Sequence, residues 1–175
     1  TEGAFVTGAT MANFTALAAA RHAVLARAGW DVAADGLIGA PQVTVMTGEE
    51  AHPTLLKSLA LLGFGRRRIV RLPVDAQGRV RADGVPRPSG PTILCLQAGN
   101  INTGAFDPFD AICTPAREAG AWVHVDGAFG LWARVSPELD SAVRGVELAD
   151  SWATDAHKML NTPYDAGFGI VRNAE

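Results

Sequence analysis

Two stretches of sequence decide the fold of this chain: HVDGAF at positions 124–129 and DSWATDAHKMLN at positions 150–161. In the first stretch an apolar run ends in an acid, Asp126, and in the second a short run ends in the pair His157 and Lys158. Short runs of this kind are typical of buried strands. Because the carboxyl ends of parallel strands meet at one edge of a sheet, we expect Asp126 and Lys158 to lie at the same edge.

The rest of the chain alternates between strand-like and helix-like segments. We predict strands at 43–47, 68–72, 92–97, 121–125, 151–154 and 167–171. We predict helices at 12–28, where apolar residues recur at spacings of three and four, and at 53–62 and 110–119. Residues 73–91, rich in proline and glycine, are predicted to form a surface excursion. This order predicts an α/β fold with a mainly parallel sheet covered by helices.

Composition narrows the class of protein further. The chain has 175 residues, 48% of them hydrophobic, and a formal net charge of −3, which is ordinary for one globular domain and gives no basic surface for nucleic acid. No apolar run approaches the roughly 20 residues of a membrane span. Two isolated cysteines, Cys95 and Cys113, do not make a disulfide framework, so we expect a cytoplasmic setting. The chain lacks an initiating methionine and ends in a strand-like segment, and we interpret it as a fragment.

Three motifs fall near the same predicted edge. The turn TGATMAN at 7–13 opens a helix, and its small residues would let backbone amides approach an anion; the alternative is a helix simply capped by Thr10. His52 follows a strand and opens a helix, where it would stack on a flat ring or merely cap the helix. The segment AGNINTG at 98–104 supplies small and polar groups, or is a turn held by asparagine side chains.

The two stretches that decide the fold carry the stronger signals. Asp126 is followed by two small residues, so that a ligand could approach it, although a helix cap is the alternative. Lys158 lies among apolar neighbours, and a partly desolvated lysine is a nucleophile for an aldehyde; the alternative is a surface lysine. A lysine that holds an aldehyde as a Schiff base, with an acid that keeps a pyridine nitrogen protonated, is the arrangement that pyridoxal 5'-phosphate requires.

Together these motifs resemble the group II pyridoxal-phosphate-dependent decarboxylases, which include aromatic amino acid, histidine, glutamate and sulfinoalanine decarboxylases. The resemblance covers essentially the whole chain and is carried, in order, by TGATMAN (7–13), AHPT (51–54), NTGAFDP (102–108), HVDGAFG (124–130) and DAHK (155–158). It departs from the family at Met11, where a glutamate is common, and at Pro53 and Thr54, where serines are frequent.

The resemblance implies a role for each matching residue. It implies that Lys158 carries the cofactor, that Asp126 pairs with the pyridine nitrogen and that His52 stacks over the ring, these three being the catalytic residues. The remaining cofactor-binding residues that it implies are Gly8, Ala9, Thr10, Asn100, Ala128 and His157. No metal ligand is implied.

The resemblance also implies a wider organisation. Residues 1–175 would be part of the large domain of a fold-type I, aspartate-aminotransferase-like enzyme, without its N-terminal segment and small C-terminal domain. The partners implied are a small amino acid substrate and a second copy of the chain. The function implied is amino acid decarboxylation. The alternatives are an aminotransferase, a cysteine desulfurase, a carbon–carbon lyase related to the sphingosine phosphate lyases, or an inactive fragment.

Overall fold

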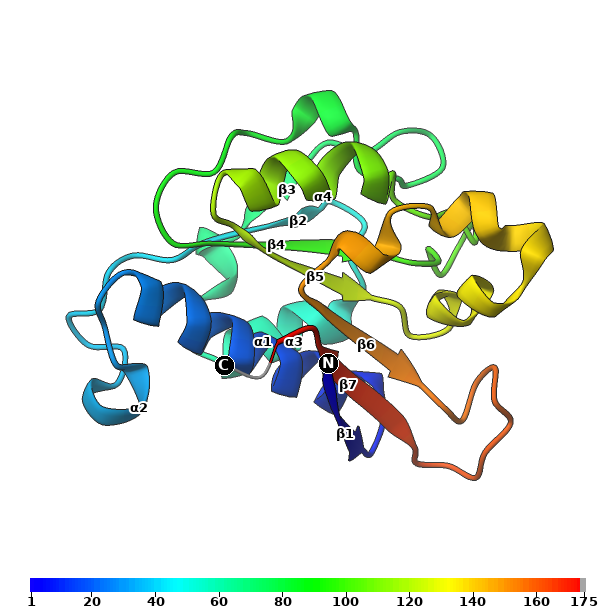
Figure 1. The fold of residues 1–175 in the computed structure, drawn as a ribbon, viewed down its shortest axis with the longest axis horizontal. Helices are drawn as coiled ribbons and strands as arrows, with labels where there is room; N and C mark the ends of the chain where they lie inside the picture. Colours follow the sequence, from blue (N-terminus) through cyan, green and yellow to red (C-terminus); the bar gives the residue numbers. More distant parts are fainter. Residues whose placement is uncertain (174–175) are drawn as a thin grey trace.

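The computed structural model describes residues 1–173 and shows one seven-stranded sheet with helices on both faces (Figure 1). The order of the strands across the sheet is β1-β7-β6-β5-β4-β2-β3. Their bounds are β1 Glu2–Val6, β2 Thr44–Gly48, β3 Val70–Leu72, β4 Thr92–Gln97, β5 Trp122–Asp126, β6 Ser151–Asp155 and β7 Gly167–Val171.

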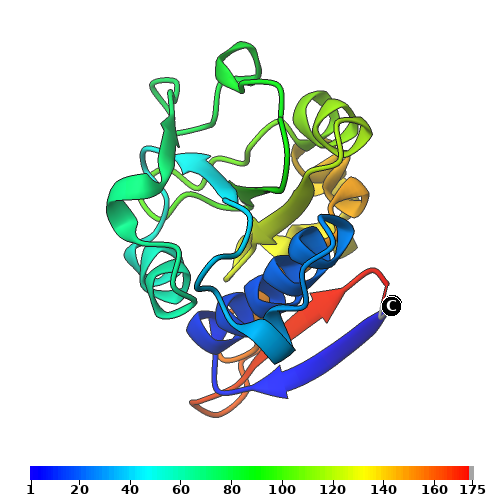
Figure 2. The same cartoon turned by 90° about the vertical axis from the view of Figure 1, so that its left-hand side faces the viewer.

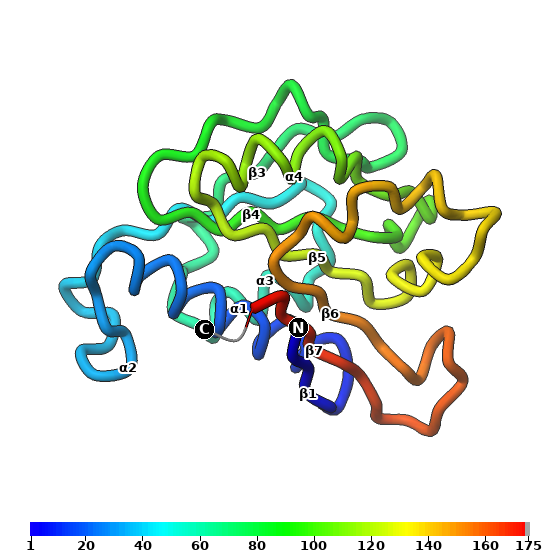
Figure 3. The backbone as a smooth tube through the Cα atoms, in the orientation of Figure 1, coloured from blue at the N-terminus to red at the C-terminus, as the bar shows by residue number. Residues whose placement is uncertain are grey.

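The sheet is mainly parallel, as predicted. Strands β3, β2, β4, β5 and β6 pair in parallel, whereas β7 pairs antiparallel with both β6 and β1. Strand β1 was not predicted, and it lies beside β7 although the two come from opposite ends of the described chain (Figure 3). The predicted strand at 68–72 is wrong in its first residues, because Arg66–Arg68 form a 3-10 turn and only Val70–Leu72 pair with β2.

The helices lie on opposite faces of the sheet. Helices α1 (Ala9–Arg27) and α3 (Pro53–Leu61) cover one face, and α4 (Phe109–Glu118) covers the other (Figures 1 and 2). The remaining helical segments are short: α2 (Val32–Asp35) and the 3-10 segments η1 (Arg66–Arg68), η2 (Ala82–Gly84), η3 (Gly130–Val135), η4 (Pro137–Val143) and η5 (Val146–Leu148). No helix within residues 1–173 is long and apolar enough to cross a membrane.

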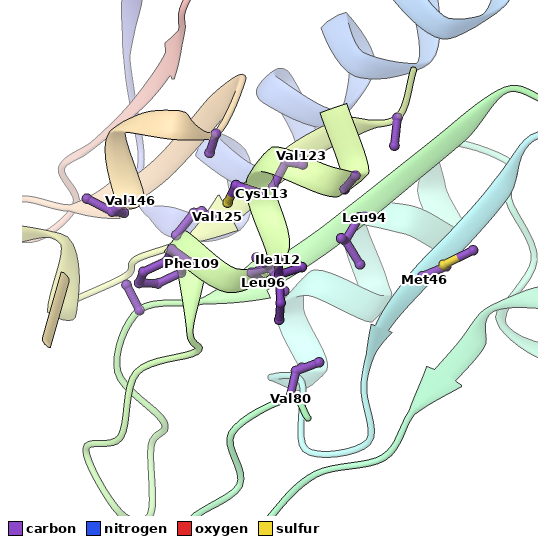
Figure 4. Packing of buried hydrophobic residues seen from close by; sticks show 14 of the residues in the cluster. Met46, Val80, Leu94, Leu96, Phe109, Ile112, Cys113, Val123, Val125 and Val146 are labelled. Carbon is purple, nitrogen blue, oxygen red and sulfur yellow. The ribbon is translucent and has the colours of Figure 1, made fainter. Parts of the chain in front are cut away.

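Strand β4 shows how the two faces are filled. Its six residues TILCLQ form an almost continuous apolar run, which is the pattern of a strand that is buried on both sides. Ile93 and Cys95 pack with α1 and α3, while Leu94 and Leu96 pack with Phe109 of α4 (Figure 4). With both faces covered, the sheet offers ligands only its edges and strand ends. The carboxyl ends of β4, β5 and β6 meet the start of α1, and the candidate site lies there.

Candidate functional site

A cavity of about 480 Å³ lies beyond the carboxyl ends of β4, β5 and β6. This volume is within the range of small-molecule sites. Of the nine residues that sequence analysis placed at the site, eight line the cavity: Gly8, Ala9, Thr10, His52, Ala128, Asp126, His157 and Lys158. The structure therefore brings together residues that are up to 150 positions apart in the chain.

Asn100 is the predicted residue that does not line the cavity. Its side chain is almost completely buried, and its amide nitrogen donates to the Glu50 carboxylate at 3.0 Å. Its oxygen accepts hydrogen bonds from the backbone amides of Asn102 at 2.8 Å and Thr103 at 3.3 Å. This is the alternative considered for the segment 98–104, a turn held by an asparagine side chain.

Asp126 is the last residue of β5 and is 4% exposed. One carboxylate oxygen accepts a hydrogen bond from the side-chain amide of Asn13, and the other accepts one from the backbone amide of Ala128, both at 3.2 Å. Burial raises the pKa of Asp126, while these two bonds and the nearby side chains of His52 and Lys158 act in the opposite direction. The carboxylate is thus held in place on one side and faces the cavity on the other.

Lys158 follows β6 and is partly exposed at the wall of the cavity. Its ammonium lies 2.9 Å from a carboxylate oxygen of Asp155 and 6.0 Å from the centre of the Phe129 ring. Lys158 is therefore a surface lysine, as the alternative held, with 43% of its side chain exposed, and it also lines the same cavity as Asp126.

Sequence analysis gave Asp155, the first residue of the DAHK motif, no role of its own, yet it is the acid with the most contacts at the site. The carboxylate is 4% exposed and accepts the backbone N–H of Ala9 at 2.5 Å. His157 Nε2 lies 3.5 Å from the same oxygen. Since Asp155 ends β6 as Asp126 ends β5, its position at a strand end was the signal that could have found it.

The turn at the start of α1 brings its backbone against β6. The helix begins at Ala9 with Gly8 as its N-cap, so the alternative of a cap by Thr10 is wrong. Gly8 has φ 134°, and a Cβ there would lie 3.1 Å from Asp155 Oδ1 and 3.2 Å from His157 Cε1. A side chain at this position would therefore crowd the acid and the histidine, and the positive end of the helix dipole faces the cavity.

His52 is both a helix cap and a cavity residue. It is the N-cap of α3, where Nδ1 accepts the backbone N–H of Thr54 at 3.3 Å. The alternative considered for His52 therefore holds, and it does not exclude the predicted role, because the ring also lines the cavity. His157 is oriented by the backbone amide of Ala166, which donates to its Nδ1 at 3.1 Å, and its ring packs on Tyr164 at 4.1 Å between centres.

Comparison with known proteins gives this geometry a context. The family described as "pyridoxal-dependent decarboxylase conserved domain" matches residues 1–175. An aromatic-L-amino-acid decarboxylase of Bacillus atrophaeus is 31% identical over 99% of this chain and 36% of its own length. The crystal structure of mouse CSAD superimposes with a TM-score of 0.90 at 28% identity, over 99% of this chain and 38% of its own.

A third relative was solved with ligands. The structure of Oryza sativa TDC with PLP and tryptamine superimposes with a TM-score of 0.82 at 30% identity, over 97% of this chain and 37% of its own. The chain therefore spans little more than a third of the length of each of these proteins.

Proposed function

Because this chain belongs to the pyridoxal-dependent decarboxylase family, we propose that it carries the cofactor site of a pyridoxal-phosphate enzyme that removes CO₂ from an amino acid. The observation that carries the proposal is the placement of Asp126 and Lys158. Asp126 ends β5, Lys158 follows the adjacent strand β6, and both line one cavity.

The residues present fit the cofactor by charge and shape. Lys158 offers an amine to the aldehyde, and the buried carboxylate of Asp126 faces the cavity from its floor. The start of α1, with its dipole and the hydroxyl-bearing residues Thr7 and Thr10, suits a phosphate. Asp155 already occupies the amide of Ala9, so phosphate binding would depend on the other donors at this turn.

Each of these residues has a definable task. When bound, pyridoxal phosphate supplies an electron-accepting ring that stabilises the carbanion left by the loss of CO₂. Asp126 would keep a proton on the pyridine nitrogen, because a positive ring nitrogen favours the ionised carboxylate that burial alone disfavours. Lys158 must lose its proton before its amine can react, and its ammonium is paired with the Asp155 carboxylate at 2.9 Å, so this ion pair would have to open first.

Three further features are proposed: the extent of the domain, the oligomeric state and the cellular location. We propose that residues 1–175 are part of a larger cofactor-binding domain, supported by the third of each relative that the chain spans. We propose a homodimer, supported by exposed apolar side chains at the cavity, Ile101 at 62% and Tyr164 at 83%. The free, buried thiols of Cys95 and Cys113 support a cytoplasmic location.

The test is product analysis on the natural full-length protein. Amino acids labelled at the carboxyl carbon, covering aromatic, acidic and basic side chains, should release labelled CO₂ for at least one class. Lys158→Ala should abolish the release, whereas Lys57→Ala, which removes the chain's only other lysine from the exposed side of α3, should leave it unchanged. Formation of a keto acid without CO₂ would instead identify an aminotransferase and refute the proposal.

A further inference from the structure

A network of buried, hydrogen-bonded side chains leads from Trp122 in the interior of the fold to Asp126. Trp122 Nε1 lies 2.8 Å from Ser151 Oγ, which lies 2.8 Å from His124 Nδ1. On the other side of the ring, His124 Nε2 lies 2.7 Å from the oxygen of Asn13, whose nitrogen lies 3.2 Å from Asp126 Oδ2. Ser151, His124 and Asn13 are all 0% exposed. Of these contacts, only the bond from Asn13 to Asp126 entered the description of the site above.

The direction of each hydrogen bond in this network follows from which groups can donate and which can accept. The indole of Trp122 can only donate, so the Ser151 oxygen accepts from it. The hydroxyl hydrogen of Ser151 needs an acceptor of its own, and His124 Nδ1 lies 2.8 Å away to take it. His124 then carries its hydrogen on Nε2 and donates it to the Asn13 oxygen. This leaves the NH₂ group of Asn13 to donate to the Asp126 carboxylate.

The Asp126 end of the network requires the same direction of hydrogen bonding. An ionised carboxylate only accepts hydrogen bonds, so Asp126 needs the nitrogen of Asn13, not its oxygen. The reverse orientation of the amide would place two oxygens together and leave both unpaired in the interior, which is costly. The carboxylate thus imposes one orientation on Asn13, and the hydrogen bonds that run back through His124 and Ser151 to the indole fit that orientation.

His124, in the middle of the network, is neutral. Burial lowers the pKa of His124 to about 3, so the ring carries no charge in the neutral pH range. The titratable groups that face Asp126 from the other packed elements are His52 of the α3 cap, Lys158 after β6 and Cys95 of β4. Burial raises the pKa of Cys95, so that it stays a thiol. The ionisation of Asp126 therefore depends on the hydrogen bonds from Asn13 and Ala128 as well as on His52, Lys158 and the cofactor.

We propose that Asn13 is a positioning residue for Asp126, and that Trp122, Ser151 and His124 act through it by fixing which end of its amide faces the carboxylate. The inference rests on the proposed function, because the purpose of an oriented, ionised Asp126 is to hold a proton on the pyridine nitrogen. The network ends on a carboxylate that lines the cavity, and this contact links it to the site.

The consequence of the inference is measurable at the ring nitrogen. Asn13→Leu removes the donor to Asp126, so the carboxylate becomes a stronger base and takes a larger share of the proton that it holds with the pyridine nitrogen. Ser151→Ala acts from a distance: without the hydroxyl, His124 Nδ1 loses its hydrogen-bond donor, so the ring no longer fixes the amide of Asn13 from that side and Asp126 alone holds it. Thr92→Val is the control, since Thr92 is equally buried but bonds only to Gly90 at the start of β4.

The experiment is nitrogen NMR on the natural full-length protein loaded with pyridoxal phosphate that carries ¹⁵N in its ring. We expect the ring signal of the unaltered protein and of Thr92→Val to be that of a protonated nitrogen. It should move toward the unprotonated value in Asn13→Leu, and in the same direction but less far in Ser151→Ala. Cofactor affinity should fall on the order of tenfold in Asn13→Leu, the factor that corresponds to one pKa unit.

Three results would overturn the inference. One is an unchanged ring signal in a folded, loaded Asn13→Leu protein, which would leave the proposed function intact. If that variant does not fold, an unchanged signal in Ser151→Ala has the same meaning. Another is a His124 ring that carries its hydrogen on Nδ1 in the unaltered protein, which imidazole NMR shows without any cofactor. The third is a failure of the unaltered protein to bind pyridoxal phosphate, which would remove the proposed function and the inference together.

Discussion

His124 should make the stability of this protein depend on pH in a way that one substitution removes. The ring is completely buried and its pKa is lowered from 6.5 to about 3, so the folded protein leaves it neutral where the unfolded chain protonates it. Between these two values the unfolded state binds more protons, and stability falls as the pH falls through 6.5. At about pH 5, 1.5 units below the unfolded value, the loss is about 2 kcal/mol.

The assay is urea unfolding of the natural protein without added cofactor, at about pH 7 and about pH 5 and constant ionic strength. Asp107 titrates in the same range with the opposite sign, because burial raises its pKa to about 6 and its folded state takes up the extra proton. The comparison is therefore made against His124→Gln, which keeps an N–H donor for Asn13 and does not titrate. On going from about pH 7 to about pH 5, the free energy of unfolding should fall by about 2 kcal/mol more in the unaltered protein than in the variant. Equal changes in both proteins would refute a neutral, buried His124.

Three further predictions follow from individual positions. Asp126→Ala should still allow the cofactor to attach to Lys158 but should lower CO₂ release on the order of a hundredfold or more, and a near-normal rate would reduce Asp126 to a structural residue. Phe109→Ala, at a completely buried side chain, should lower the free energy of unfolding by about 3–5 kcal/mol, whereas Val135→Ala at 77% exposure should stay within about 0.5 kcal/mol; similar urea midpoints would contradict this. Gly145→Ala should cost more than Gly29→Ala in thermal unfolding, because both glycines have positive φ but only at Gly145 would the Cβ meet backbone, 2.4 Å from Asp110 N. Equal costs would count against that clash.

The α/β architecture could be predicted because its signals are local. The apolar runs that became β2, β4, β5, β6 and β7 are short and bounded by turns, and both the fold class and the family resemblance are confirmed. Strand β1 escaped prediction because its residues are mostly exposed and show no alternation. It is held by its pairing with β7, and that partner lies more than 160 residues away in the chain.

The candidate site could be predicted as far as strand ends determine it. Asp126 and Lys158 were placed together because parallel strands deliver their carboxyl ends to one edge. The contacts that orient these residues could not be predicted, since they join distant segments through side chains. Asn13 bonds Asp126 across 113 positions, and the Ala9 amide bonds Asp155 across 146. The partner of Asn100 could not be predicted for the same reason: its amide donates to Glu50, 50 positions away, and not to a group of the cavity.

The most direct test of the account is to locate the cofactor on the chain. The natural full-length protein is incubated with pyridoxal phosphate, reduced with borohydride, digested and mapped by mass spectrometry. Because Lys57 and Lys158 are the only lysines in these 175 residues, the assignment within them is unambiguous. We expect a reduced cofactor adduct on Lys158 that disappears in Lys158→Ala and persists in Lys57→Ala. An adduct on another lysine, or none at all, would contradict it.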